Sequence, residues 1–186
     1  MSRPWIRAWG AVATMVGVAT FLIVVLILHL LQPDYEPRHQ LMSELALGQH
    51  GWAMFVAFFG LAVAVLGLQV AVAECGGSRG YMVLLGVAAL FFLAAGIFPL
   101  GATSLIHISA IGVAFVLSVL AMYLFPTNAG RASVAGPRAV SWPLAAGVAV
   151  SVASGHAVIP MGIGQRLAAV CLLVWLGIVG WRLYRL

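Results

Sequence analysis

The residues best suited to chemistry are gathered in a few places along a chain of 186 residues that carries few charges. It has five histidines and four acidic residues, and its nine basic residues are all arginines. One segment, residues 33–52 (PDYEPRHQLMSELALGQHGW), holds three of the acids, one arginine and two of the histidines. Imidazole and carboxylate groups serve as metal ligands and as general acids or bases, so this concentration indicates a functional site.

The hydropathy of the chain shows which elements would position these groups. Hydrophobic residues make up 64% of the chain and charged residues 7%, with a mean hydropathy of +1.14, which excludes a soluble domain because too few polar residues remain to cover its surface. Six apolar runs are each about long enough to cross a hydrocarbon layer of roughly 30 Å. We therefore expect an all-α fold, a single polytopic bundle over residues 1–186 with six transmembrane helices at about 10–31, 52–73, 81–100, 104–125, 142–159 and 167–183.

The arginines predict the orientation of this bundle. With both termini cytoplasmic, seven arginines lie on the cytoplasmic side and only Arg38 and Arg166 lie outside. The segment 33–52 is then the first external loop. Pro37 suits the first position of a helix and Gly48 the position after its end, so a short extracytoplasmic surface helix is expected over residues 37–47.

Helix counting brings several polar residues to one depth. His107 lies about one turn into the fourth predicted helix, His156 about one turn before the end of the fifth, and Arg166 at the start of the sixth, each roughly 5 Å below the outer interface. Small residues flank both histidines, which favours close helix approach and turns them inward. We expect one outward-facing pocket, with an ion pair between arginine and glutamate, formed by Ser43, Glu44, His107, His156 and Arg166. The alternative for each is a structural role, such as a hydrogen bond to a neighbouring helix.

Several stretches form a recognisable pattern: PDYEP...SELALGQHGW, FPLG...SLIHISA, YLFP, SGH and GIGQRL...VWLG. Together they resemble the bacterial membrane-protein family known as domain of unknown function 998 (DUF998), over nearly the whole chain. The resemblance implies a six-helix protein of the bacterial cytoplasmic (inner) membrane, and it carries over to the five residues of the expected pocket. Gln165 stands where the family often has Glu. The family supplies no activity.

Four functions fit these residues. One is a binding module whose pocket holds a lipid-like or other small amphiphilic ligand. Another is a zinc-dependent intramembrane lipid hydrolase with His107, His156 and Glu44 as metal ligands. A third is a haem-binding electron-transfer protein with His107 and His156 as axial ligands, and the fourth is a structural subunit or assembly factor with membrane-protein partners. Membrane lipids are expected partners and nucleic acid is not, because the arginines are scattered along the chain.

Overall fold

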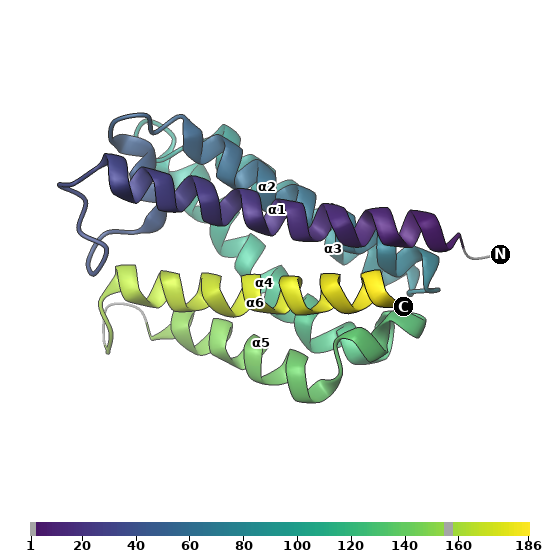
Figure 1. Cartoon of the computed structure of the whole chain (residues 1–186). Helices are drawn as coiled ribbons and strands as arrows, with labels where there is room; N and C mark the ends of the chain where they lie inside the picture. Colours follow the sequence, from purple (N-terminus) through teal and green to yellow (C-terminus); the bar gives the residue numbers. More distant parts are fainter. Residues whose placement is uncertain (1–2, 155–157) are drawn as a thin grey trace.

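The computed structural model describes residues 3–154 and 158–186, and within these ranges the chain is helical with no β-strand (Figure 1). The described α-helices are α1 (Pro4–Leu31), α2 (Ala53–Glu74), α3 (Arg79–Ile97), α4 (Ser104–Asn128), α5 (Arg138–Ala153) and α6 (Met161–Arg185). Two short 3-10 helices, η1 (Met42–Leu47) and η2 (Gly130–Ala135), lie in the connections. The predicted all-α fold is confirmed.

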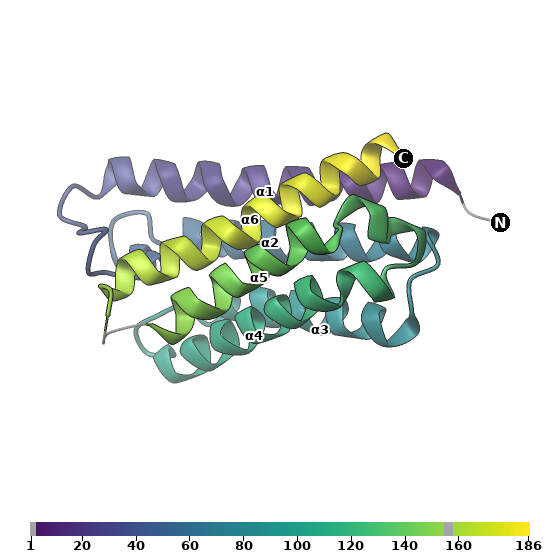
Figure 2. The same cartoon turned by 90° about the horizontal axis from the view of Figure 1, so that it is seen from below.

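The helices pack in chain order as a closed ring (Figures 1 and 2). Each helix packs against the next one along the chain, and α6 returns to pack against α1. Successive helices are antiparallel neighbours, as short connections require. The two ends of the chain therefore lie at one end of the bundle, here called the terminal end, and the segment 33–52 lies at the opposite end, here called the loop end.

Glycines bring α1 and α2 into close contact. A Cβ atom added to Gly17 would lie 2.3 Å from the carbonyl oxygen of Gly60, and one added to Gly10 would lie 2.7 Å from that of Gly67. A real Cβ atom could not occupy either position. The two backbones therefore approach this closely only because glycine has no side chain. Small residues in the sequence predicted close contacts for α4 and α5, whereas this glycine contact holds α1 against α2.

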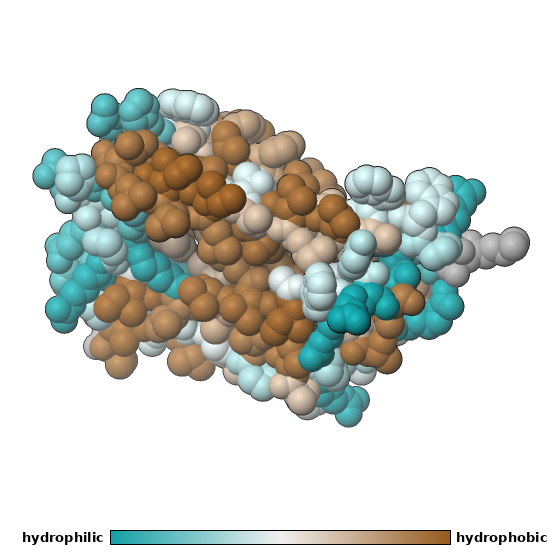
Figure 3. Space-filling view, in the orientation of Figure 1, coloured by the Kyte–Doolittle hydropathy of each residue, from teal (hydrophilic) through white to brown (hydrophobic). Residues whose placement is uncertain are grey.

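The surface of the bundle is divided into an apolar band and two polar ends (Figure 3). Five helices, α1, α2, α3, α4 and α6, are long and apolar enough to cross a membrane. Large hydrophobic side chains are exposed on this band, among them those of Leu22, Leu90 and Val116. Such a surface fits lipid and not water, so the chain has the character of a multi-pass membrane protein.

The fifth helix is shorter than the others and displaced from the predicted span. It was expected at 142–159, but α5 runs over Arg138–Ala153 and has 16 residues, or about 24 Å. Pro137 precedes its first residue, which favours a helix start at that point, and Ser154 ends it. The first helix also differs, because it begins at Pro4, where proline suits the first helical position.

The helix expected over residues 37–47 is found only as η1, and its first residue is Met42. Residues 37–40 form turns instead. The carbonyl oxygen of Gln40 accepts a hydrogen bond from Nη1 of Arg166, so it does not take part in a helix. The side chains of Met42, Ser43 and Leu45 are buried, which means that η1 inserts one face into the bundle.

Candidate functional site

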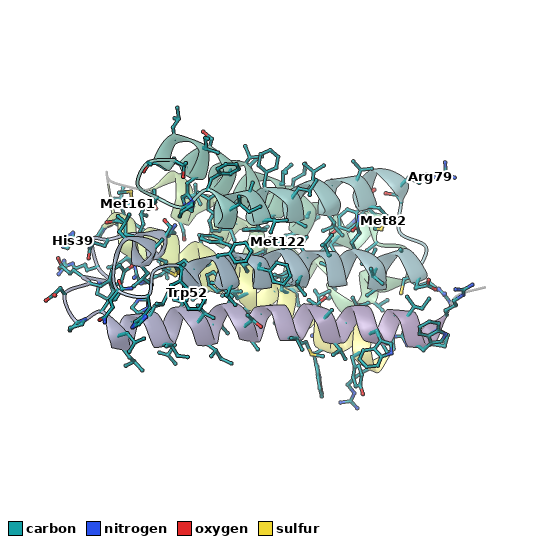
Figure 4. All side chains as sticks on the ribbon, turned by 90° about the horizontal axis from the view of Figure 1, so that it is seen from above. His39, Trp52, Arg79, Met82, Met122 and Met161 are labelled. Carbon is teal, nitrogen blue, oxygen red and sulfur yellow. The ribbon has the colours of Figure 1, made fainter. Side chains whose placement is uncertain are left out.

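The predicted site residues come from three elements at the loop end. Ser43 and Glu44 lie on η1, His107 lies in the first turn of α4, and Arg166 lies in the first turns of α6. Figure 4 shows His39 and Met161 at this end and Arg79 at the opposite end. His156 lies outside the described residues.

Arg166 is the centre of a hydrogen-bonded group here called the Arg166 cluster, formed by Arg166, His29, Tyr35 and the backbone of Gln40. Its Nη1 donates to the carbonyl oxygens of Gln40 at 3.0 Å and Gly162 at 2.9 Å. Its Nη2 donates to the hydroxyl oxygen of Tyr35 and contacts Nε2 of His29 at 3.1 Å. The guanidinium group is therefore occupied by partners from α1, the first loop and α6.

The contacts of His29 fix how its ring is protonated. A guanidinium group only donates hydrogen bonds, so Nε2 of His29 must accept the bond from Arg166. Nδ1 lies 2.7 Å from the carbonyl oxygen of Val25, which only accepts, so Nδ1 carries the proton. His29 is thus a neutral imidazole with both nitrogens satisfied, and it fixes the orientation of Arg166.

Tyr35 connects the cluster to the loop. Its hydroxyl donates to the carbonyl oxygen of Leu41 at 2.9 Å, and its ring lies beneath the guanidinium carbon of Arg166 at 5.4 Å from the ring centroid. Burial raises the pKa of Tyr35, and the hydrogen bond from Arg166 opposes that rise without cancelling it. The neutral hydroxyl is therefore the form that this site favours.

The sequence GIGQR at the start of α6 holds the first loop in place. A Cβ atom on Gly162 would lie 2.5 Å from the carbonyl oxygens of Pro37 and Gln40, so the loop packs directly on the helix backbone. Oε1 of Gln165 accepts a hydrogen bond from the backbone nitrogen of Met42 at 2.6 Å. A carboxylate oxygen would accept the same bond, so Gln165 performs this contact as well as a Glu would.

Glu44 is satisfied by its own loop. Its Oε1 accepts a hydrogen bond from the backbone nitrogen of Leu41 at 2.8 Å. Within the described residues the one ion pair closer than 4.0 Å joins His39 to Glu36 at 3.7 Å, so Glu44 and Arg166 do not form the expected pair. Glu44 lines a cleft of about 300 Å³ with Asp34. Ser43, 2% exposed, instead lines a small interior cavity beneath η1.

His107 occupies a separate position inside the bundle and is only 1% exposed. Its Nδ1 lies 2.8 Å from the carbonyl oxygen of Ala95 and 3.0 Å from that of Phe98, so this nitrogen donates to the end of α3. The ring packs edge-on against Phe58. Its Nε2 is buried and has no hydrogen-bond partner among the described residues.

His107 is one of the residues that line an apolar groove of about 390 Å³, here called the His107 groove. The loop contributes Ala46 and Gly51 to its wall, and the helices contribute residues such as Phe55, Phe58 and Ile97. The lining does not include Glu44 or Arg166. Of the residues expected to share one pocket, the structure thus places His107 in one space and Glu44 in another.

The described residues contain no group of three His, Cys, Asp or Glu side chains that would hold a metal ion. The zinc set His107, His156 and Glu44 and the haem pair His107 and His156 both include a residue outside the described ranges. Both therefore remain predictions. Sequence reasoning missed the roles of His29 and Tyr35, although Tyr35 lies in the PDYEP stretch that it singled out.

Comparison with known proteins gives a family and no activity. The chain matches the family described as "Protein of unknown function (DUF998)" over residues 15–182, and it therefore belongs to that family. The match includes every described residue of the Arg166 cluster and of the His107 groove. No curated protein and no solved structure matched the chain.

Proposed function

We propose that this member of the DUF998 family is a protein of the bacterial cytoplasmic membrane that binds a lipid-like amphiphile in the His107 groove, on the extracytoplasmic side. In this proposal six helices span the membrane and both termini are cytoplasmic. The arginine distribution supports that orientation, because only Arg38 and Arg166 of the nine lie at the loop end.

In this proposal the short helix α5 also spans the membrane, and together with the five longer helices it makes six spans. It packs between α4 and α6 and closes the ring, so it lies at the same depth as its neighbours. Arg138 stacks on Trp142 at 5.1 Å from the ring, an arrangement that suits the membrane interface. A span of about 24 Å is accommodated by local thinning of the bilayer at modest cost.

The observation that carries the proposed activity is the unpartnered Nε2 of His107. Because Nδ1 donates to two carbonyl oxygens, a neutral ring leaves Nε2 as a hydrogen-bond acceptor. A buried acceptor without a donor costs about 1–3 kcal/mol. A ligand that supplies an O–H or N–H group would remove this cost, and it would therefore bind where the chain leaves the acceptor free.

The residues that line the groove indicate what the chain and the head of the ligand are like. Its described lining residues carry no charge, and two of them, Phe55 and Ile97, are exposed toward the apolar band at 43% and 53%. An apolar chain fits this environment, and the head must be an uncharged hydrogen-bond donor, as in a fatty alcohol or a glyceride. Nε2 is buried, so entry of the head requires lining side chains to move, and the flexible side chain of Met54 is suited to such a movement.

The other predicted site residues support the groove indirectly in this proposal. Arg166 is occupied by the loop and by His29, so it does not take an anionic head. Arg166 and Glu44 instead hold the first loop, which supplies Ala46 and Gly51 to the groove wall. Ser43 anchors η1 inside the bundle. These residues position the groove and do not contact the ligand.

A pair of ligands that differ in the hydroxyl hydrogen, which a methyl group replaces in one of them, tests the proposal. Oleyl alcohol and its methyl ether have nearly the same shape, but only the alcohol donates a hydrogen bond. We expect the purified protein to bind the alcohol about tenfold more tightly, measured by ligand-dependent shifts in melting temperature. Equal affinities would contradict the proposal.

A matched pair of variants locates the binding. Ala46→Leu fills the His107 groove without changing the hydrogen bonds of Nδ1, and it should weaken alcohol binding at least tenfold. Ala149→Leu fills an apolar groove of about 240 Å³ between α4 and α5 that has no histidine, and it should leave binding unchanged. An equal effect of the two variants would place the ligand elsewhere. Metal analysis and a visible spectrum of the same preparation test the zinc and haem alternatives.

A further inference from the structure

A second cavity lies at the terminal end, far from the His107 groove. It has a volume of about 270 Å³, and three arginines, Arg3, Arg7 and Arg131, line it together with Glu74 and Cys75. Arg3 and Arg7 come from the start of α1, and Arg131 comes from η2. We call this cavity the arginine pocket.

The contact between η2 and the end of α2 fixes the position of Arg131. The backbone nitrogen of Arg131 donates to the carbonyl oxygen of Cys75 at 2.9 Å. Gly130 has a φ of +57°, and a Cβ atom there would lie 2.4 Å from the same oxygen, so this approach requires glycine. Arg131 is therefore set beside Arg7 by the fold and not by a free loop.

The chain compensates only part of the positive charge of the arginine pocket, because Glu74 is the one acidic side chain among three arginines. Its one acidic side chain, Glu74, accepts a hydrogen bond from the backbone nitrogen of Arg3 at 2.7 Å. No arginine side chain lies within 4.0 Å of a carboxylate oxygen in the described ranges, where the one contact of this kind joins His39 to Glu36. Each guanidinium group has five N–H donors, whereas the side chains of Arg7 and Arg131 each make one hydrogen bond among the described residues, to the carbonyl oxygens of Leu183 and, at 3.5 Å, of Glu74.

Other arginines at the terminal end have different surroundings. Arg138 stacks on Trp142 and Arg185 stacks on Trp181, at 5.1 Å and 5.7 Å from the rings. Arg182 donates to the carbonyl oxygen of Ala135 at 3.3 Å. Arg79 is exposed at the start of α3, at the edge of the bundle (Figure 4). The general excess of arginine at this end therefore does not account for three guanidinium groups around one cavity.

We propose that the arginine pocket binds the phosphate group of an anionic phospholipid. Guanidinium groups match phosphate oxygens in geometry as well as in charge, and basic pockets between transmembrane helices are suited to anionic headgroups. Trp5 and Trp9, next to Arg3 and Arg7 in α1, are 61% and 69% exposed, which places the pocket at the depth of the lipid headgroups. A bound phosphate would also relieve the repulsion among the three arginines.

Lipid binding to the purified protein, measured by native mass spectrometry in a neutral detergent, tests this proposal. We expect phosphatidylglycerol to bind about tenfold more tightly than phosphatidylcholine. The double variant Arg7→Gln with Arg131→Gln should remove this preference, because glutamine is neutral but still donates hydrogen bonds. Arg79→Gln makes the same kind of charge change outside the pocket and should keep the preference within about twofold.

Two results would overturn the proposal. One is an equal loss of preference in Arg79→Gln, which would show a diffuse charge effect in place of a site. The other is displacement of phosphatidylglycerol by millimolar inorganic phosphate, which would identify a free anion as the ligand. Melting temperatures without lipid establish that the variants are folded. Binding of oleyl alcohol at the His107 groove does not depend on these arginines, so the two proposals fail independently.

Discussion

The two described histidines inside the loop end, His29 and His107, differ in how completely the chain satisfies them. His29 accepts a hydrogen bond from Arg166 and contacts the carbonyl oxygen of Val25, so both of its ring nitrogens have partners. His107 contacts two carbonyl oxygens through Nδ1, and its Nε2 has no partner among the described residues. Similar depth therefore does not imply a similar role.

The difference separates a structural group from a candidate binding group. In the Arg166 cluster, both terminal nitrogens of Arg166 and both ring nitrogens of His29 are already used in contacts that hold the first loop against α1 and α6. His107 lines an apolar groove, and its buried Nε2 has no hydrogen-bond partner among the described residues. Polar residues that suggest a catalytic site in the sequence can thus have a structural role. A single buried atom without a hydrogen-bond partner in apolar surroundings instead indicates a ligand-binding position.

The largest expected effect comes from removing Arg166. Arg166→Gln leaves the carbonyl oxygen of Gln40 and Nε2 of His29 without their charged donor, so we expect a loss of about 3 kcal/mol in the free energy of unfolding. Arg38→Gln removes the same charge from an exposed site in the same loop and should change stability by less than about 0.5 kcal/mol. Denaturation in detergent measures both. Equal stabilities would show that the cluster does not hold the loop.

The two histidines themselves provide the direct comparison. His29→Phe removes an acceptor that Arg166 uses and should cost about 1–2 kcal/mol without ligand. His107→Phe loses the hydrogen bonds to α3 but also removes the unpartnered Nε2, so the opposing effects should leave a net change below about 1 kcal/mol. If His107→Phe were the more costly variant, capping of α3 would be the main role of His107.

Much of the fold follows from the sequence because long apolar runs and short connections leave few arrangements. The exceptions are segments whose backbone is held by distant residues. The run before Met42 is amphipathic, but its Gln40 carbonyl bonds to Arg166, 126 positions away, and no local pattern reports such a contact. The α1–α2 glycine contact could have been predicted from the sequence, because Gly10 and Gly17 on one helix and Gly60 and Gly67 on the next have the same spacing of seven residues.

The sequence predicted how deeply the candidate site residues lie in the bundle, but it did not predict which of them contact one another. Helix counting and neighbouring small residues indicated an inward position for His107, and its 1% exposure agrees with that position. The expected pairing of Glu44 with Arg166 rested on the need of a buried carboxylate for a cation. The backbone nitrogen of Leu41 supplies a donor instead, and the sequence gives no sign of it because Leu41 lacks the side chain typical of a capping residue.

The smallest expected effect is a dependence of stability on alkaline pH through Tyr35. Burial raises the pKa of Tyr35 above its ordinary value of 10.0, so at high pH the hydroxyl ionises more readily in the unfolded chain than in the folded one. The stabilisation is complete below pH 10.0 and is lost as the pH rises through the higher folded-state value. Tyr35→Phe should cost roughly 1 kcal/mol at neutral pH through loss of the bond to Leu41.

Melting curves at increasing pH above neutrality test this expectation. The melting temperature of the unmodified protein should fall more steeply above pH 10.0 than that of Tyr35→Phe, because the variant has no hydroxyl to ionise at this site. Tyr184→Phe, which changes an exposed tyrosine at the terminal end, should keep the steeper slope. Parallel curves for the protein and Tyr35→Phe would mean that the Tyr35 hydroxyl is open to water, and the Arg166 cluster would then be looser than its hydrogen bonds indicate.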